Sequence, residues 1–108
     1  MELLTKELLQ AFEKQGDTSQ KHAGEIKIIS KYFNPAGAGT WYLYEFNETD
    51  RIFWCFADLG IPDCAECGTV SLDELINLEL PFRLKIERDL YFPVAKYTLQ
   101  EIIDGKRP

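Results

Sequence analysis

The fold is most easily recognised from FNPAGAGTWYLYEF, residues 33–46, where a turn rich in small residues leads straight into an aromatic strand. Gly37 and Gly39 can adopt positive φ without steric cost. Pro35 fixes its own φ and favours an extended conformation of Asn34. Such a turn either closes a β-hairpin or lets a ligand approach the backbone closely. We expect it to be structural, because it lacks the patterns of phosphate-binding and dinucleotide-binding loops.

Strand signals continue on both sides of this stretch. Runs of β-branched and aromatic residues precede and follow it, and the polar residues 47–50 between two of the runs are typical of a hairpin connection. A later segment alternates well enough to be extended. The expected strands and extended segments are residues 26–33, 41–46, 51–57, 68–70 and 84–92.

Three short helices are expected from their capping residues. Thr5 is a suitable N-cap for a first helix that ends before Gly16. Residues 71–74 and 98–101 both match the capping box S/T-x-x-E and predict a middle helix to about Asn77 and a short C-terminal helix. The connections are too short for several parallel crossovers. The sequence therefore predicts an α+β fold with a small, mostly antiparallel sheet and N-terminal, middle and C-terminal helices.

Length and charge limit the classes of function. We expect one domain over residues 1–108, located in the cytoplasm, because no leading basic and apolar signal segment is present. The longest apolar run, residues 52–57, is too short to cross a membrane. A net charge of −6 opposes nonspecific binding to nucleic acid, so we do not expect that partner unless a local basic patch binds it. The acidity suits a basic protein partner, or mimicry of DNA.

The three cysteines are expected to be free thiols, because an odd number does not suit a disulfide scaffold. Cys64 and Cys67 have metal-ligand spacing, but a structural zinc site needs four ligands. Cys55 and His22 would have to complete it, and both are remote in the sequence. We therefore expect no metal and no other cofactor.

Strand alternation draws attention to Arg88. In an extended 84–92 segment this arginine shares a face with Leu84, Ile86, Leu90 and Phe92. An arginine on an apolar face keeps its charge and needs a carboxylate or a ligand anion. The same alternation places Glu45 with Trp41 and Leu43, which makes Glu45 the first candidate partner and Glu74 the second. Two interpretations stay open, a structural ion pair and an anion-binding site.

No pattern in the sequence brings together the residues of a catalytic site. The carboxylates of Glu45, Glu74, Glu87 and Asp89 could serve as acids or bases or hold Mg²⁺, but nothing places them within reach of one another. The only histidine, His22, lies in a polar segment. The candidate ligand-binding, partner-binding or ion-pair residues are Asn34, Gly37, Gly39, Thr40, Trp41, Glu45, Glu87, Arg88 and Asp89.

Three blocks carry a family resemblance. FNPAGAGTWY, GTVSLDEL at 68–75 and LKIERDLYF at 84–92 resemble, in order and spacing, the bacterial family known as domain of unknown function 2958. The resemblance covers most of residues 1–104, with 57–67 the least similar part. It implies a small protein carried by phages, plasmids and conjugative elements, some near anti-restriction genes, and it implies no particular activity.

Two functions follow as hypotheses. The first is a noncatalytic module that binds a protein partner encoded by the host or by the mobile element. The second is a small enzyme or binder for a nucleotide or other anion near Arg88, with Glu45 or Glu87 as a base. The aromatic residues that are not needed in the core could cover a protein partner or stack on bases, and the acidity favours the protein. The sequence does not specify the oligomeric state.

Overall fold

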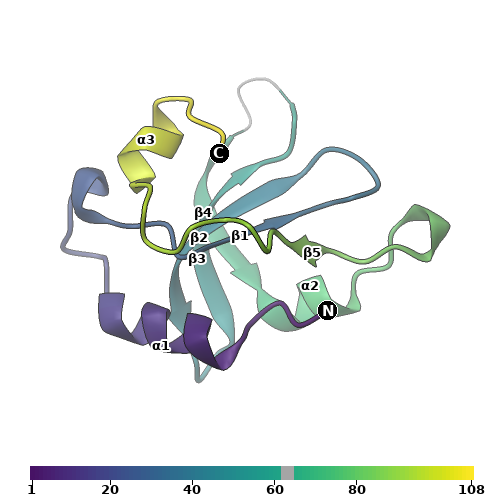
Figure 1. Ribbon diagram of the computed structural model, residues 1–108, viewed down its shortest axis with the longest axis horizontal. Helices are drawn as coiled ribbons and strands as arrows, with labels where there is room; N and C mark the ends of the chain where they lie inside the picture. Colours follow the sequence, from purple (N-terminus) through teal and green to yellow (C-terminus); the bar gives the residue numbers. More distant parts are fainter. Residues whose placement is uncertain (62–64) are drawn as a thin grey trace.

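In the part of the chain that the structure describes, five strands form one antiparallel sheet in the order β4-β3-β2-β1-β5, with three α-helices around it (Figure 1). The computed structural model describes residues 1–61 and 65–108. The predicted α+β class, with N-terminal, middle and C-terminal helices, is confirmed. The elements are α1 (Lys6–Gln15), η1 (Ala23–Glu25), β1 (Ser30–Phe33), β2 (Thr40–Asn47), β3 (Ile52–Asp58), β4 (Glu66–Ser71), α2 (Leu72–Asn77), η2 (Pro81–Arg83), β5 (Glu87–Arg88) and α3 (Leu99–Ile103).

The helices begin where their caps predict. The side chains of Thr5, Ser71 and Thr98 accept hydrogen bonds from backbone N–H groups in the first turns of α1, α2 and α3. In α3 the bond is reciprocated by Glu101, whose carboxylate accepts the Thr98 N–H. Each cap satisfies a donor that the helix leaves unpaired. Within the described residues, no helix has the length and apolar character needed to cross a membrane.

The first strand is shorter than expected. Residues 26–33 were predicted to be extended throughout, but β1 begins only at Ser30. Ile28 instead exchanges backbone hydrogen bonds with Ala95 and Tyr97, in the segment that leads into α3. This long-range pairing takes the backbone of Ile28 outside the main sheet, whereas the Ile29 N–H still donates to the Leu43 carbonyl of β2. No local pattern in the sequence announces the pairing.

Two clusters of buried side chains form the core. Alternation along β2 and β3 sends Leu43 and Phe53 to one cluster and Tyr42 and Phe56 to the other. Leu8 and Phe12 of α1 and Leu72 and Leu75 of α2 belong to the first cluster. Leu99 and Ile102 of α3 belong to the second. The sheet therefore has apolar contacts on both faces, as expected for a small domain whose helices cover both of them.

The glycine-containing turn at 34–39 closes on itself between β1 and β2. The Asn34 N–H donates to the Gly39 carbonyl (2.9 Å), and the Asn34 Oδ1 accepts from the Ala36 N–H (2.8 Å). Gly39 has φ +138°, a conformation that side chains rarely adopt, whereas Gly37 is in an ordinary one with no atom near its missing Cβ. Only one of the two glycines therefore needs its conformational freedom.

We expect Gly39→Ala to lower the free energy of unfolding by about 1–3 kcal/mol, because the added Cβ would be strained. That Cβ would also lie 3.4 Å from both the Asn34 Cβ and the Trp41 ring. The matched control is Gly37→Ala, which should stay within about 0.5 kcal/mol of the wild type. Urea unfolding curves measure both. Equal losses in the two variants would contradict this account of the turn.

Candidate functional site

Arg88 lies in β5 next to buried Tyr32 of β1. It is paired with Tyr32 of β1 and is half-buried. Its Nε donates to the Glu2 carbonyl at 3.0 Å. Within residues 1–61 and 65–108, no carboxylate lies within ion-pair distance of the guanidinium. A backbone carbonyl from the N-terminal segment therefore takes the place of the expected acid.

The expected ion pair between Glu45 and Arg88 is not formed, because a β-bulge turns Glu45 to the other face of the sheet. The register of β2 against β3 shifts after Leu43, which faces Cys55, so that Glu45 faces Trp54. The extra residue in the bulge breaks the two-residue alternation on which the prediction rested. Trp54 packs against the second cluster, whereas Tyr32, the neighbour of Arg88, belongs to the first.

The second candidate partner of Arg88 does not pair with it either. Glu74 is exposed in the first turn of α2, where its N–H donates to the Ser71 hydroxyl at 3.2 Å. In the described part of the chain no ion pair involves Glu74. Its local role is at the start of the helix, where a negative charge is favourable.

The extended segment predicted over 84–92 contains only the two residues of β5, because Asp89 begins a turn. The Asp89 Oδ1 accepts from the Tyr91 N–H (3.0 Å), and the Asp89 carbonyl accepts from the Phe92 N–H (3.3 Å). Leu90 is consequently 58% exposed instead of facing the core. The Asp89 carboxylate also forms an ion pair with Lys31 (3.6 Å). Aspartate commonly turns the chain in this way.

The nine residues predicted for the site form three groups, two of which are neighbours across β1. One group lies in the β1–β2 turn and the start of β2, and Glu45 lies alone on the opposite face. The third group lies at β5, where Glu87 is paired with Phe33. The first group is Asn34, Gly37, Gly39, Thr40 and Trp41, and the third is Glu87, Arg88 and Asp89. The first and third groups flank the same part of β1, because Tyr32 pairs with both Trp41 and Arg88. Glu45 is therefore the predicted residue that the structure separates from the others.

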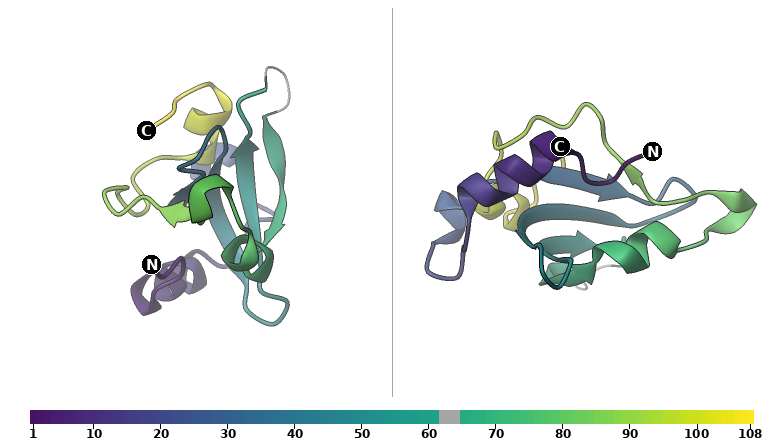
Figure 2. Two further views of the ribbon diagram at one scale, coloured as in Figure 1. Left: turned by 90° about the vertical axis from the view of Figure 1, so that its right-hand side faces the viewer. Right: turned by 90° about the horizontal axis from the view of Figure 1, so that it is seen from below.

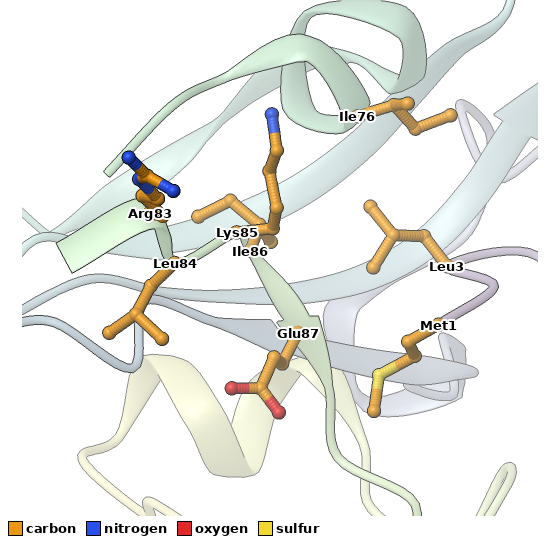
Figure 3. Close-up of a pocket in the computed structure, with 8 residues that line it drawn as sticks. All are labelled: Met1, Leu3, Ile76, Arg83, Leu84, Lys85, Ile86 and Glu87. Atoms are coloured by element: carbon orange, nitrogen blue, oxygen red, sulfur yellow. The ribbon is translucent and has the colours of Figure 1, made fainter. Parts of the chain in front are cut away.

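A cavity of about 310 Å³ lies beside β5 (Figure 3). We call it the arm groove, because part of its lining comes from the projecting segment 78–86. Leu3 and Ile86 form its buried floor. Figure 3 shows Arg83 and Lys85 on one side of it and Met1 and Ile76 on the other. The groove is lined by Met1, Leu3, Ile76, Arg83, Leu84, Lys85, Ile86 and Glu87.

The segment between α2 and β5, residues 78–86, projects from the body of the molecule, and we call it the arm (Figures 1 and 2). At its tip Phe82 and Arg83 have φ of +63° and +61°, two successive non-glycine residues in the left-handed region. Each such residue costs about 1–3 kcal/mol. The Phe82 side chain is 91% exposed. Sequence reasoning missed this residue, because an aromatic residue next to a proline carries no sign that it will be exposed.

The thiols differ in their surroundings. Burial raises the pKa of the Cys55 thiol from 9.0 to about 12. Burial of its sulfur also raises the pKa of Cys67, which lies on the edge strand β4. Cys64, the other member of the predicted metal-ligand pair, lies outside the described residues. Among the residues that are described, no group of three or more His, Cys, Asp or Glu side chains could hold a metal ion.

The fold and the groove define a small α+β domain with a curved antiparallel sheet and a projecting arm. The chain belongs to the family described as "Protein of unknown function (DUF2958)", which it matches over residues 3–105. The resemblance carried by the three sequence blocks is thereby confirmed. No curated protein and no solved structure matches the chain.

Proposed function

We propose that this protein is a noncatalytic interaction module that binds a protein partner through the arm and the arm groove. The observation that carries the proposal is Phe82, an exposed aromatic side chain held at a strained tip. Strained backbone is retained where the surrounding structure or a function requires it. A phenylalanine in water contributes nothing to the stability of the fold, but in a partner's pocket it buries a large apolar area.

The chemistry of the groove indicates the kind of segment that it accepts. Arg83 and Lys85 form no ion pair with any residue that the structure describes. The Glu87 carboxylate points away from the Lys85 ammonium (Figure 3). The floor is apolar, and the cations lie on one side. A partner segment with an apolar side chain for the floor and carboxylates for these cations is complementary to it.

The partner that we propose is a protein of the host or of a mobile element, met in the cytoplasm. Nucleic acid fits less well, because the chain as a whole carries a charge of −6 and would repel phosphates. We also propose that this protein is carried by a phage, plasmid or conjugative element, as the family resemblance implies.

Photo-crosslinking from position 82, followed by affinity measurement with the partner it identifies, tests the proposal. We expect Phe82→Ala to weaken binding at least tenfold, as central aromatic anchors commonly do. The matched control is Tyr91→Ala, because Tyr91 is 95% exposed and does not line the groove. Charge reversal by Lys85→Glu should also weaken binding, and more so at low salt. Equal affinity of wild type, F82A and K85E for the crosslinked partner would refute the proposed surface.

A second function, binding of a nucleotide or other anion near Arg88, is favoured by this half-buried residue, whose guanidinium has no carboxylate partner in the described chain. Its Nε is already engaged by Glu2, so a ligand would meet the remaining N–H groups. Titration with inorganic phosphate and with AMP, in the wild type and in Arg88→Gln, decides it. Binding that does not depend on Arg88 would remove this candidate.

A further inference from the structure

The opposite side of the sheet carries a second cavity of about 420 Å³ that the arm does not reach, and we call it the acid–aromatic pocket. It combines carboxylates, hydroxyls and two aromatic side chains at the mouth of the second core cluster. Its lining residues are Asp17, Thr18, Ser19, Ile26, Tyr44, Glu45 and Trp54.

The β-bulge in β2 builds this pocket. Because the register shifts between Leu43 and Glu45, Glu45 lies directly opposite Trp54 on β3, with its side chain on the same face. Trp54 is only half-buried, so part of its ring faces solvent. Gln15 fixes the bulged segment, since its side-chain amide donates to the Tyr44 carbonyl. An acidic group is thereby held next to an accessible aromatic face.

The Glu45 carboxylate is oriented before any ligand arrives. Its Oε1 accepts both the backbone N–H of Thr18 (2.8 Å) and the Thr18 hydroxyl (2.6 Å), and Thr18 itself is 6% exposed. In the described residues no hydrogen bond goes to Oε2, and no basic group lies within ion-pair distance of Glu45. One oxygen thus holds the geometry while the other is available.

Asp17 supplies a second negative charge at the rim. Hydrogen bonds from Ser19, first of all from its backbone N–H, lower the pKa of the Asp17 carboxyl, so that it is ionised at neutral pH. Lys21 is the basic residue that acts on Asp17, but its ammonium donates to the Gln15 carbonyl at 2.9 Å. Among the residues described, neither acid in this pocket is neutralised by an ion pair.

We propose that the acid–aromatic pocket binds an organic cation, an ammonium or guanidinium group. The Glu45 Oε2 and the Asp17 carboxylate would accept its hydrogen bonds, and the Trp54 ring would attract its charge through the quadrupole of the ring. The cation belongs either to a lysine or arginine side chain of another protein or to a free amine. This site is independent of the arm groove, which adjoins the first core cluster.

Titrations followed by amide NMR shifts test the site with four probes. Lysine and arginine blocked at both ends represent a protein side chain, and putrescine represents a free amine. Norleucine blocked in the same way has the length of lysine without its charge. We expect the cationic probes to bind at least five times more tightly than norleucine and to shift residues around Glu45 and Trp54. Preference for the blocked amino acids assigns the pocket to a protein partner, and preference for putrescine assigns it to a small amine.

Single substitutions show whether the cationic probes bind in the acid–aromatic pocket. Glu45→Gln keeps the shape of the side chain and should weaken the cationic probes at least fivefold without affecting norleucine. Glu48→Gln is the matched control, because it removes the same charge from the exposed β2–β3 turn. Should Glu45→Gln fail to fold, Asp17→Asn at the exposed rim should still weaken the cationic probes twofold or more. Equal binding of charged and uncharged probes, or unchanged binding in every pocket variant, overturns the proposal.

Discussion

Replacement of Phe53 with alanine is expected to lower the free energy of unfolding by about 3–5 kcal/mol, the usual cost of removing a buried phenylalanine ring. Phe53 is 0% exposed and lies at the centre of the first core cluster. Its ring centroid is 5.4 Å from that of Phe12, 5.6 Å from that of Tyr32 and 4.6 Å from that of Phe46. The cavity would thus remove contacts from α1, β1 and β2 at once.

A domain of this size has a total stability of about 5–15 kcal/mol, so this single change is expected to leave a large part of the protein unfolded at moderate temperature. Urea and thermal unfolding measure the loss. The matched control is Phe82→Ala, which removes the same ring from a position that is 91% exposed and should change stability by no more than about 0.5 kcal/mol. A similar loss in both variants would mean that the core is assigned wrongly.

Raising the pH above 9 is expected to destabilise the fold steeply. Burial raises the pKa of the Cys55 thiol from 9.0 to about 12, and burial also raises the pKa of the Tyr32 and Tyr44 phenols above 10.0. The unfolded chain therefore loses these protons at a lower pH than the native state does. Because the unfolded state then binds fewer protons, stability is complete below pH 9 and falls as the pH rises through the native pKa values.

The slope of the unfolding free energy against pH can be used to isolate the contribution of the Cys55 thiol. Each such group contributes up to about 1.4 kcal/mol per pH unit, so Cys55 alone accounts for about 4 kcal/mol across its three-unit interval. Urea unfolding at pH 8, 10 and 11 gives the slope for the wild type and for Cys55→Ala. We expect the free energy of unfolding to fall less steeply with pH in the variant. This holds even if weaker packing makes the variant less stable at neutral pH. Parallel slopes would show that the Cys55 thiol is not protected in the native state.

Local sequence signals predicted most of the secondary structure. The caps at Thr5, Ser71 and Thr98 and the polar turn at 47–50 appear where expected, because each depends on a few neighbouring residues and their backbone hydrogen bonds. The boundaries of residues 26–33 and 84–92 were less accurate. There the backbone pairs with distant segments or is turned by an aspartate side chain.

The residues of the candidate sites were only partly predictable. Glu45 and Arg88 were singled out by strand alternation, but that periodicity is valid only within an uninterrupted strand. One extra residue in β2 moved Glu45 to the pocket on the other face. Phe82 was not singled out at all, since the exposure of a side chain depends on where the whole arm projects.

The amino-acid sequence alone determined the fold class, the helix starts, the hairpins and the family, because short-range backbone chemistry and side-chain periodicity are sufficient for them. Only the tertiary structure decided which groups the charged side chains contact. Arg88 is held by the carbonyl of Glu2, and Glu45 by Thr18, because contacts between segments far apart in the chain depend on the register of the sheet and on where the N-terminal segment lies.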